Sequence, residues 1–243
     1  MGGATGEFRA YLAVPEGQGP WPGVVVIHDV LGMTTDLKRI TDRFAAGGYL
    51  ALAPDLYDAG DGSKLHCVIR TVRAHFTGHG PAYESLRAAR EHLISDPRCT
   101  GRVGVAGFCM GGGFCLQLAP SGLFNVAAAN YALLPKDVDK LETSCPVVAS
   151  FGAKDHIVAT DTAARLEAVL TRGGVPNDVK QYSDVGHSFM NQLALPGAIR
   201  VVAGIAGLAY SAPEADDAWS RILSFFQQHL GEAGSDGGEP GNG

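Results

Sequence analysis

The sequence lacks the features that mark nucleic-acid-binding and membrane-spanning proteins. It carries 19 lysine and arginine residues against 25 aspartate and glutamate residues, a formal net charge of −6, and no run of basic residues. This balance argues against nucleic acid as a partner. The longest apolar runs are far shorter than the roughly 20 residues that cross a bilayer, so we expect no membrane partner. The N-terminal residues lack a basic region followed by an apolar run, so we expect no signal peptide.

Cysteines are few, and their spacing suggests no pairing. Five occur, an odd number without a Cys-x-x-Cys pair, which predicts neither a disulfide framework nor a zinc site. Metal-ligand spacings and phosphate-cradling glycine loops are also missing from the sequence, so we expect no metal and no cofactor. These absences favour a reducing compartment, the cytoplasm, where a reactive thiol survives.

What the sequence does contain is an alternation of apolar strands and amphipathic helices. Val24–Ile27 is a continuous β-branched run, typical of a parallel strand buried on both faces. The alternation predicts an α/β fold with a mostly parallel sheet and helices on both faces. It predicts a single domain over residues 1–231 and a disordered Gly-rich tail at 232–243. Further strands are predicted at 8–14, 49–54, from 103, and at 124–131, 146–151 and 179–182; helices are predicted at 36–46, 65–76, 83–94, to about 118, 161–170 and 215–230.

The chain is organised around one cysteine in a glycine-flanked turn. Gly107-Phe108-Cys109-Met110-Gly111 follows an apolar strand and opens a helix, the pattern of a nucleophile elbow with cysteine in place of serine. A strand that turns sharply into a helix brings its backbone close to itself, and glycine removes the Cβ atoms that would collide. The alternative is that these residues only pack, since free cysteine is often a small buried hydrophobe.

Two later residues complete the chain order of an α/β-hydrolase triad, which is nucleophile, acid, histidine. Asp155 and then His187 follow Cys109, each in a loop after a predicted strand. Loops after parallel strands meet at one edge of the sheet, so the three side chains are predicted to lie together. His187 would take the proton of Cys109, and Asp155 would orient the imidazole. The backbone N–H groups of Met110 and Val30 are the predicted oxyanion donors.

Other polar residues compete for these roles or have a plainer explanation. Asp155 also suits a turn, where Asp after Gly-x-x is common. Asp184 precedes His187 by three residues and is expected to be a loop carboxylate. His28 ends a strand, where it either lines the pocket or fills a polar niche. The remaining histidines have no partner pattern, and Cys115 is expected to pack inside its helix.

These residues together resemble the dienelactone hydrolase family, over about Phe8 to Leu230. Three segments carry the resemblance: the cysteine elbow Gly104–Gly112, the acid segment Gly152–Val158 and the histidine segment Gly186–Phe189. Softer matches are Asp55–Tyr57 and Asp29–Gly32.

The resemblance implies an α/β-hydrolase fold and a monomeric hydrolase of small lactones or enol esters that needs no cofactor. It implies substrate binding or control of the resting thiol by Asp29, Ser188 and Arg70. Family members that act on the dienelactone bind its carboxylate with two arginines. Asn191 stands at one of these positions, and Arg73 is the alternative to Arg70 at the other.

Two other functions are compatible with the sequence. One is a general carboxylesterase or thioesterase with the same triad. The other is a non-catalytic protein of the same fold that binds a small ligand and keeps Cys109 inert. The sequence leaves open whether residues 65–80 cover the pocket as a lid.

Overall fold

A single mixed sheet forms the centre of the protein. The computed structural model describes residues 9–58, 64–192 and 208–231. Among these residues, seven strands form one sheet in the order β1-β3-β2-β4-β5-β6-β7. β1 pairs antiparallel with β3, and every other neighbouring pair is parallel. The strands are β1 (Ala10–Ala13), β2 (Trp21–Ile27), β3 (Leu50–Pro54), β4 (Cys99–Phe108), β5 (Ala127–Asn130), β6 (Val147–Gly152) and β7 (Asn177–Tyr182).

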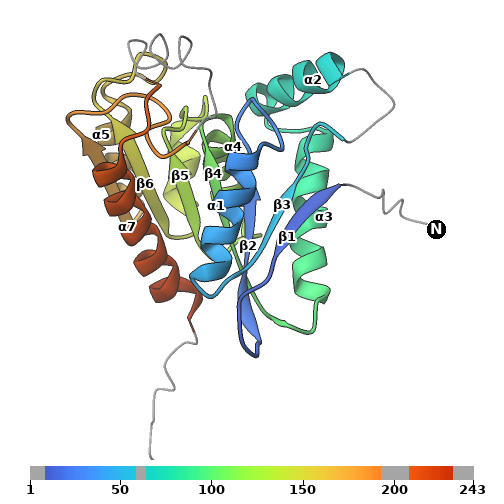
Figure 1. Cartoon of the computed structure of the whole chain (residues 1–243). Coiled ribbons are helices and arrows are strands. Elements are labelled where there is room, and N and C mark those ends of the chain that lie inside the picture. The colour runs from blue at the N-terminus through green and yellow to red at the C-terminus, as the bar shows by residue number, and fades with distance from the viewer. Residues whose placement is uncertain (1–8, 59–63, 193–207, 232–243) are drawn as a thin grey trace, which may run out of the picture.

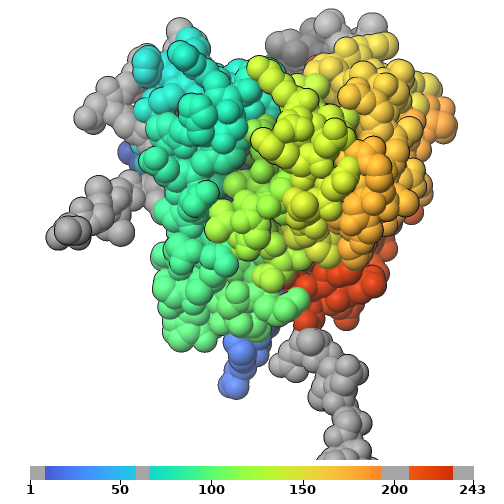
Figure 2. Space-filling view, turned by 180° about the vertical axis from the view of Figure 1, so that it is seen from behind, coloured from blue at the N-terminus to red at the C-terminus, as the bar shows by residue number. Residues whose placement is uncertain are grey.

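Helices cover both faces of this sheet (Figure 1). α1 and α7 contribute their buried residues to the core on one face, and α3, α4 and α5 contribute theirs to the core on the other. Seen from behind, the second face shows α2 and α3 beside the segment that begins with α4 and ends with α5 (Figure 2). The helices are α1 (Thr35–Ala46), α2 (Lys64–Thr77), α3 (Pro81–Ser95), α4 (Met110–Leu118), α5 (Thr162–Arg172) and α7 (Ala212–Leu230), with short 3-10 turns η1 (Ala119–Ser121) and η2 (Val138–Thr143).

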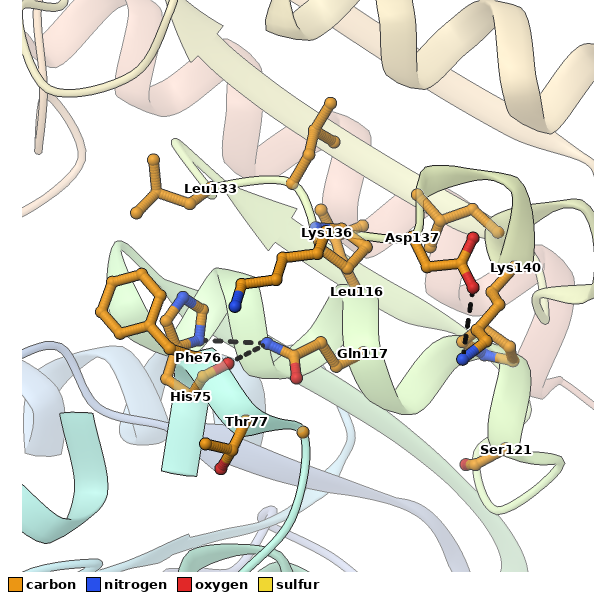
Figure 3. Close-up of a pocket in the computed structure, with 15 residues that line it drawn as sticks. His75, Phe76, Thr77, Leu116, Gln117, Ser121, Leu133, Lys136, Asp137 and Lys140 are labelled. Atoms are coloured by element: carbon orange, nitrogen blue, oxygen red, sulfur yellow. Dashed lines mark hydrogen bonds and ion pairs between the residues drawn. The ribbon is translucent and has the colours of Figure 1, made fainter. Parts of the chain in front are cut away.

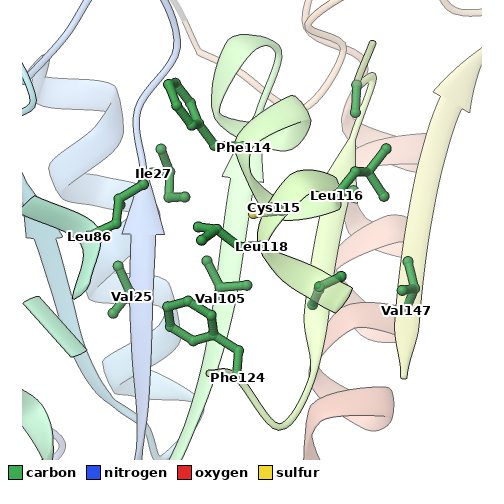
Figure 4. Packing of buried hydrophobic residues seen from close by; sticks show 14 of the residues in the cluster. Val25, Ile27, Leu86, Val105, Phe114, Cys115, Leu116, Leu118, Phe124 and Val147 are labelled. Atoms are coloured by element: carbon green, nitrogen blue, oxygen red, sulfur yellow. The ribbon is translucent and has the colours of Figure 1, made fainter. Parts of the chain in front are cut away.

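The β-branched run in β2 explains why both faces are covered. Val25 and Ile27 point into the core under α3 and α4, whereas Val24 and Val26 point into the core under α1 and α7. Successive side chains of a strand alternate between faces, so a strand that is apolar at every position must be covered on both. Figure 4 shows Val25 and Ile27 of β2 packed with Val105 of β4.

The core under α1 and α7 is built on aromatic contacts. Trp219 of α7 is fully buried, with its ring centroid 5.1 Å from that of Phe44 in α1 and 6.1 Å from that of Phe108 in β4. Phe108 directly precedes the cysteine of the elbow. The same cluster therefore holds two helices and the end of the strand that carries the elbow.

The α/β architecture with a mostly parallel sheet is confirmed, while several element ends differ from the prediction. The strand predicted from 124 begins only at Ala127, because its pairing with β4 and β6 starts there. The strand predicted from Val24 begins earlier, at Trp21, which donates a backbone hydrogen bond to Arg98 O (2.7 Å). Within the described residues, the helices are all too short or too polar to cross a bilayer. The predicted tail, 232–243, lies outside the described residues, and the single-domain assignment stays a prediction.

We expect Trp219→Ala to lower the free energy of unfolding by about 3–5 kcal/mol, because it removes a large buried side chain and leaves a cavity between α7 and the sheet. Urea denaturation followed by far-UV circular dichroism measures the loss. Ser220→Ala, at the exposed neighbouring position, is the control and should change stability by less than about 0.5 kcal/mol. Equal stability of the two variants would contradict a supporting role for this cluster.

Candidate active site

Polar residues from several loops meet at the carboxyl edge of the parallel strands. β4 ends at Phe108 and leads to Cys109, β6 leads to Asp155, and β7 leads to His187. The loop after β2 carries Asp29 and Val30. In open α/β sheets, loops at this edge are where ligands bind. The fold thus gathers residues that are far apart in the sequence.

Cys109 occupies a strained turn between β4 and α4. Its backbone has φ +55° and ψ −116°, in the left-handed half of the map that residues other than glycine rarely adopt. The turn is fixed on both sides, because Cys109 N–H donates to Asn130 O (3.1 Å) and Cys109 O accepts from Gly113 N–H (3.1 Å). Cys109 is partly exposed and directly precedes the first residue of α4. Cys109 therefore lies at the positive end of a helix dipole.

Gly107 and Gly111 permit this turn. A Cβ on Gly107 would lie 2.2 Å from the carbonyl oxygen of Gly111, and a Cβ on Gly111 would lie 2.3 Å from the carbonyl oxygen of Ile27. No side chain fits at either position without moving backbone. The first turn of α4 thus packs directly on the ends of β4 and β2, as the sequence pattern indicates.

Asp155 and His187 form a buried hydrogen-bonded pair. His187 Nδ1 lies 2.8 Å from Asp155 Oδ2, and both side chains are almost completely buried. Asp155 Oδ1 accepts the backbone N–H groups of Ile157 (2.7 Å) and Val158 (3.0 Å). Burial raises the pKa of Asp155, but the hydrogen bonds from His187 and these N–H groups outweigh it and hold the pKa below its usual value. The carboxylate is therefore ionised beside the imidazole.

The second ring nitrogen of His187 is left for the cysteine. Nε2 is buried and has no hydrogen-bond partner among the described residues. Burial lowers the pKa of His187, but the hydrogen bond to Asp155 and the proximity of the Cys109 sulfur raise it to about 9. The imidazole is thus protonated up to about pH 9. The structure brings the three predicted triad residues into one electrostatic cluster.

Two backbone N–H groups are available next to the cysteine. Met110 is the first residue of α4, where a helix leaves the N–H without an intrahelical acceptor. Val30 lies in the loop after β2, and its N–H belongs to the Asp29–Val30 peptide, whose carbonyl oxygen lies 2.6 Å from His28 Nδ1. The next peptide is also held, because Val30 O accepts the hydroxyl of Tyr57 (2.8 Å). This arrangement is compatible with the predicted oxyanion donors, whose role stays a prediction.

Asp29 stands close to the triad without a hydrogen bond to the cysteine. Its Oδ1 accepts Leu31 N–H (2.7 Å), and none of the described residues donates a hydrogen bond to its Oδ2. Burial raises the pKa of Asp29, while the charge of His187 acts in the opposite direction. His28 fills a polar niche, because its Nδ1 lies 2.6 Å from Asp29 O and its Nε2 accepts Leu56 N–H (3.1 Å). His28 thus joins the loops after β2 and β3.

The other two predicted binding residues, Ser188 and Arg70, lie in different parts of the structure. Ser188 follows His187, is buried and has φ +61°, so it shapes the histidine loop. Arg70 lies on α2 and makes no hydrogen bond or ion pair with Cys109, Asp155 or His187. Its role in substrate binding stays a prediction. Asp184 is an exposed loop carboxylate paired with Lys154 (3.1 Å), as expected.

Asn191 belongs to a buried network that the sequence did not reveal. Its Oδ1 accepts the hydroxyl of Tyr131, and its Nδ2 donates to Asp36 Oδ2 (2.8 Å). Asp36 Oδ1 accepts Gln192 N–H (3.1 Å). The Tyr131 ring stands edge-on against His187, with centroids 5.1 Å apart. The network therefore ties the histidine loop to the start of α1 and supports the His187 imidazole from the side.

A cavity in the described part of the chain lies away from these residues. It has a volume of 380 Å³ and is lined by α2, α4 and the segment from Leu133 to Leu141, but by none of Cys109, Asp155 and His187 (Figure 3). His75 was expected to lack partners, yet it is buried here, and Gln117 Nε2 donates to its carbonyl oxygen (2.7 Å) and lies 3.3 Å from its Nδ1. We assign the active site from the geometry of the triad and not from this cavity.

The remaining cysteines have no chemical partners of this kind. Cys115 is fully buried in the core and packs as expected. Burial raises the pKa of the Cys115 thiol, which keeps it protonated. Groups of three or more histidine, cysteine, aspartate or glutamate side chains placed to hold a metal ion do not occur among the described residues.

Comparisons with known proteins identify a family and a fold. Residues 8–230 match the sequence model of the Dienelactone hydrolase family. The chain is 29% identical over 233 residues to "Protein usf" of Aquifex pyrophilus, with 92% of this chain and 94% of that protein covered. It is 27% identical over 241 residues to a Yersinia pestis protein named "Putative carboxymethylenebutenolidase", with 92% and 84% covered. Its fold is similar to the solved structure of a dienelactone hydrolase-like promiscuous phosphotriesterase from metagenomic libraries, with 24% identity, a TM-score of 0.71, and 93% and 100% covered.

We expect Asp155→Asn to lower the pKa of His187 from about 9, because the variant removes the anion that stabilises the imidazolium. An NMR titration of the His187 ring proton measures this change. With the His187 pKa lowered, the imidazolium–thiolate pair persists over a narrower range on the alkaline side. Asp184→Asn, an exposed carboxylate in a nearby loop, is the control and should leave the titration in place. An unchanged pKa in Asp155→Asn would contradict the assignment of the acid.

We expect Tyr131→Phe to lower the free energy of unfolding by about 1–3 kcal/mol, because it leaves the buried Asn191 Oδ1 without a donor. Tyr11→Phe is the matched control, since its hydroxyl donates to Asp42 (2.8 Å) at an exposed site. Chemical denaturation of both variants gives the comparison. A loss no larger than that of Tyr11→Phe would show that the buried network adds nothing specific.

Proposed function

The chain belongs to the dienelactone hydrolase family, and on this premise we propose that it is a cysteine-dependent hydrolase of small lactones or enol esters. One observation carries the proposal: His187 Nδ1 lies 2.8 Å from Asp155 Oδ2, and the Cys109 sulfur is close enough to the same imidazole to raise its pKa. A thiol nucleophile, an imidazole that exchanges a proton with it and an orienting carboxylate are the parts that acyl transfer needs. The proposed triad is Cys109, Asp155 and His187.

The proposed first half-reaction forms an acyl-cysteine. The Cys109 sulfur attacks the ester carbonyl, a C–S bond forms, and negative charge moves to the carbonyl oxygen. The N–H groups of Met110 and Val30 would stabilise this oxyanion, and loss of one such donor typically costs about 3 kcal/mol of barrier. The carbonyl then re-forms, the ester C–O bond breaks, and the leaving enolate takes a proton from the His187 imidazolium. In a lactone the leaving group stays attached to the acyl chain.

The second half-reaction releases the acid. Neutral His187 removes a proton from water, the water oxygen forms a bond with the thioester carbonyl, and the C–S bond breaks. Sulfur leaves as the thiolate and is again paired with the imidazolium. The raised pKa of His187, about 9, supports this role because it keeps the imidazole charged at neutral pH, ready to give a proton to the leaving group. Asp155 remains ionised throughout and holds the ring in place.

Two further features belong to the proposal. We assign the enzyme to the cytoplasm, because a reducing compartment preserves a thiolate nucleophile. We propose that its partner is a small-molecule ester or lactone substrate. We also propose that the enzyme is a monomer. The loops around the triad are the candidates for binding this substrate, with Asp29, Ser188 and Arg70 as the proposed binding or thiol-controlling residues.

We expect Cys109→Ala to reduce the turnover of a dienelactone to background and Cys109→Ser to retain a small fraction of it, because a hydroxyl at this turn is a poorer nucleophile than a thiolate. Loss of the ultraviolet absorbance of the lactone measures turnover, and Cys115→Ala is the control for loss of a thiol outside the site. Intact mass spectrometry after rapid acid quench should detect an acyl adduct on the wild type. Full activity in Cys109→Ala would refute the nucleophile, and inactivity of the wild type on lactones and activated esters would favour a non-catalytic protein.

A further inference from the structure

The cavity beside α4 has no part in the proposed reaction. It lies between the end of α2, the middle of α4 and the segment from Leu133 to Leu141 (Figure 3), and Cys109, Asp155 and His187 do not line it. Its volume of 380 Å³ falls within the range of about 300–1,000 Å³ that is typical of small-molecule sites. The cavity is therefore large enough to hold a ligand of its own.

One side of this cavity is apolar. Leu116 and Leu141 are fully buried and belong to the core under α3 and α4, and Leu133 is partly buried beside them. Phe76, in the last turn of α2, also lines the cavity and is 55% exposed. An aromatic ring that stands in water next to buried leucines offers a surface on which the ring or chain of a ligand can pack.

The polar side carries a cation without a counter-ion. Three charged residues line the cavity, namely Lys136, Asp137 and Lys140. Lys140 Nζ lies 3.3 Å from Asp137 Oδ2, so these two charges offset each other. The neighbouring Asp139 does not line the cavity and pairs with Arg172 (2.5 Å). Lys136 forms no ion pair with any described residue, and its side chain extends across the cavity (Figure 3). The lining therefore has a net positive charge that favours an anion.

His75 adds a neutral hydrogen-bond donor. The side-chain amide of Gln117 has a fixed orientation, because its Oε1 accepts the hydroxyl of Tyr83 and its Nε2 donates to His75 O (2.7 Å). The same Nε2 lies 3.3 Å from His75 Nδ1, which makes Nδ1 the acceptor and places the ring proton on the Nε2 atom of His75. Burial lowers the pKa of His75, so the ring is neutral at pH 7. Its Nε2–H has no acceptor among the described residues and is available to a ligand.

From these observations we propose that the cavity is a second binding site, which takes a small carboxylate with an apolar, ring-sized body. Lys136 and the Nε2–H of His75 bind the carboxylate, and Phe76 and the leucines contact the body. One unpaired cation and one neutral donor match a single negative charge, whereas a phosphate dianion calls for more charged donors. The inference does not depend on the proposed hydrolase activity, since none of these residues is assigned to the reaction.

The first test compares 3-phenylpropionate with its uncharged counterpart 3-phenylpropanamide, each titrated into the wild-type protein and followed by NMR. The His75 ring and the Gln117 side-chain amide report on the cavity, and the His187 ring reports on the triad. We expect the carboxylate to shift the cavity signals with a Kd about three- to fivefold below that of the amide, the effect of an ion pair that water can reach. Shifts confined to His187, no saturable shift, or equal Kd values would overturn the proposal.

The second test changes the charges of the lining. Lys136→Gln should raise the Kd of 3-phenylpropionate about three- to fivefold. Asp137→Asn should lower it, because the variant leaves Lys140 without its partner next to the carboxylate. Lys38→Gln makes the same change in net charge at an exposed position of α1, across the sheet, and should leave the Kd as it is. An effect of Lys136→Gln no larger than that of Lys38→Gln would reject the role of Lys136.

The third test concerns the apolar side and uses two exposed residues of α2. Phe76→Ala should raise the Kd of 3-phenylpropionate about fivefold, as expected for the loss of roughly 40 Å² of buried apolar contact. Ile69→Ala is the matched control, since Ile69 is 59% exposed on the same helix and does not line the cavity. Equal Kd values for the two variants would show that the body of the ligand does not bind against Phe76. All three tests measure binding alone, so their failure would leave the hydrolase proposal standing, and inactivity on lactones would leave this site in place.

Discussion

The contact between backbone and backbone at the start of α4 is the constraint on which the site depends. Gly107 and Gly111 let the first turn of α4 rest on the ends of β4 and β2, and a Cβ at either glycine would lie within 2.3 Å of a carbonyl oxygen. This contact fixes the strained φ of Cys109 and the position of Met110 at once. It also brings the end of β2 under the helix, so the loop that carries Val30 starts from the same point. Strain of this kind persists only where the surrounding structure determines it fully.

Electrostatic interactions then set the charges of Asp155 and His187. Asp155 is buried but has donors for both oxygens, which offsets the cost of removing a carboxylate from water. Its charge in turn helps to keep His187 protonated to about pH 9. Few buried side-chain atoms among the described residues lack a partner, and one of them is His187 Nε2. The ring nitrogen of His187 that Asp155 does not bind is thus left without a partner.

The turn at Cys109 and the convergence of Cys109, Asp155 and His187 could be predicted because their signals are local. Glycines two residues to either side of Cys109 indicate the turn, and Asp155 and His187 each follow a strand, so sheet topology alone gathers them. The role of Asn191 could not be predicted in the same way. Its partner Asp36 is 155 residues away in α1, whereas Asn191 lies in a loop. Only the packing of α1 against the histidine loop brings the two residues together. The buried contacts of His75 were missed for the same reason, since they come from α4.

The backbone of Ile157 and its side chain serve two different ends of the site. The N–H donates a hydrogen bond to Asp155 Oδ1 (2.7 Å), while the side chain is 55% exposed. A change of side chain at this position leaves the amide, and so the acid of the triad, in place. The side chain at position 157 can therefore vary while the position of Asp155 stays the same. Proteins with such loops can therefore change the molecule that they bind while they keep the same buried carboxylate.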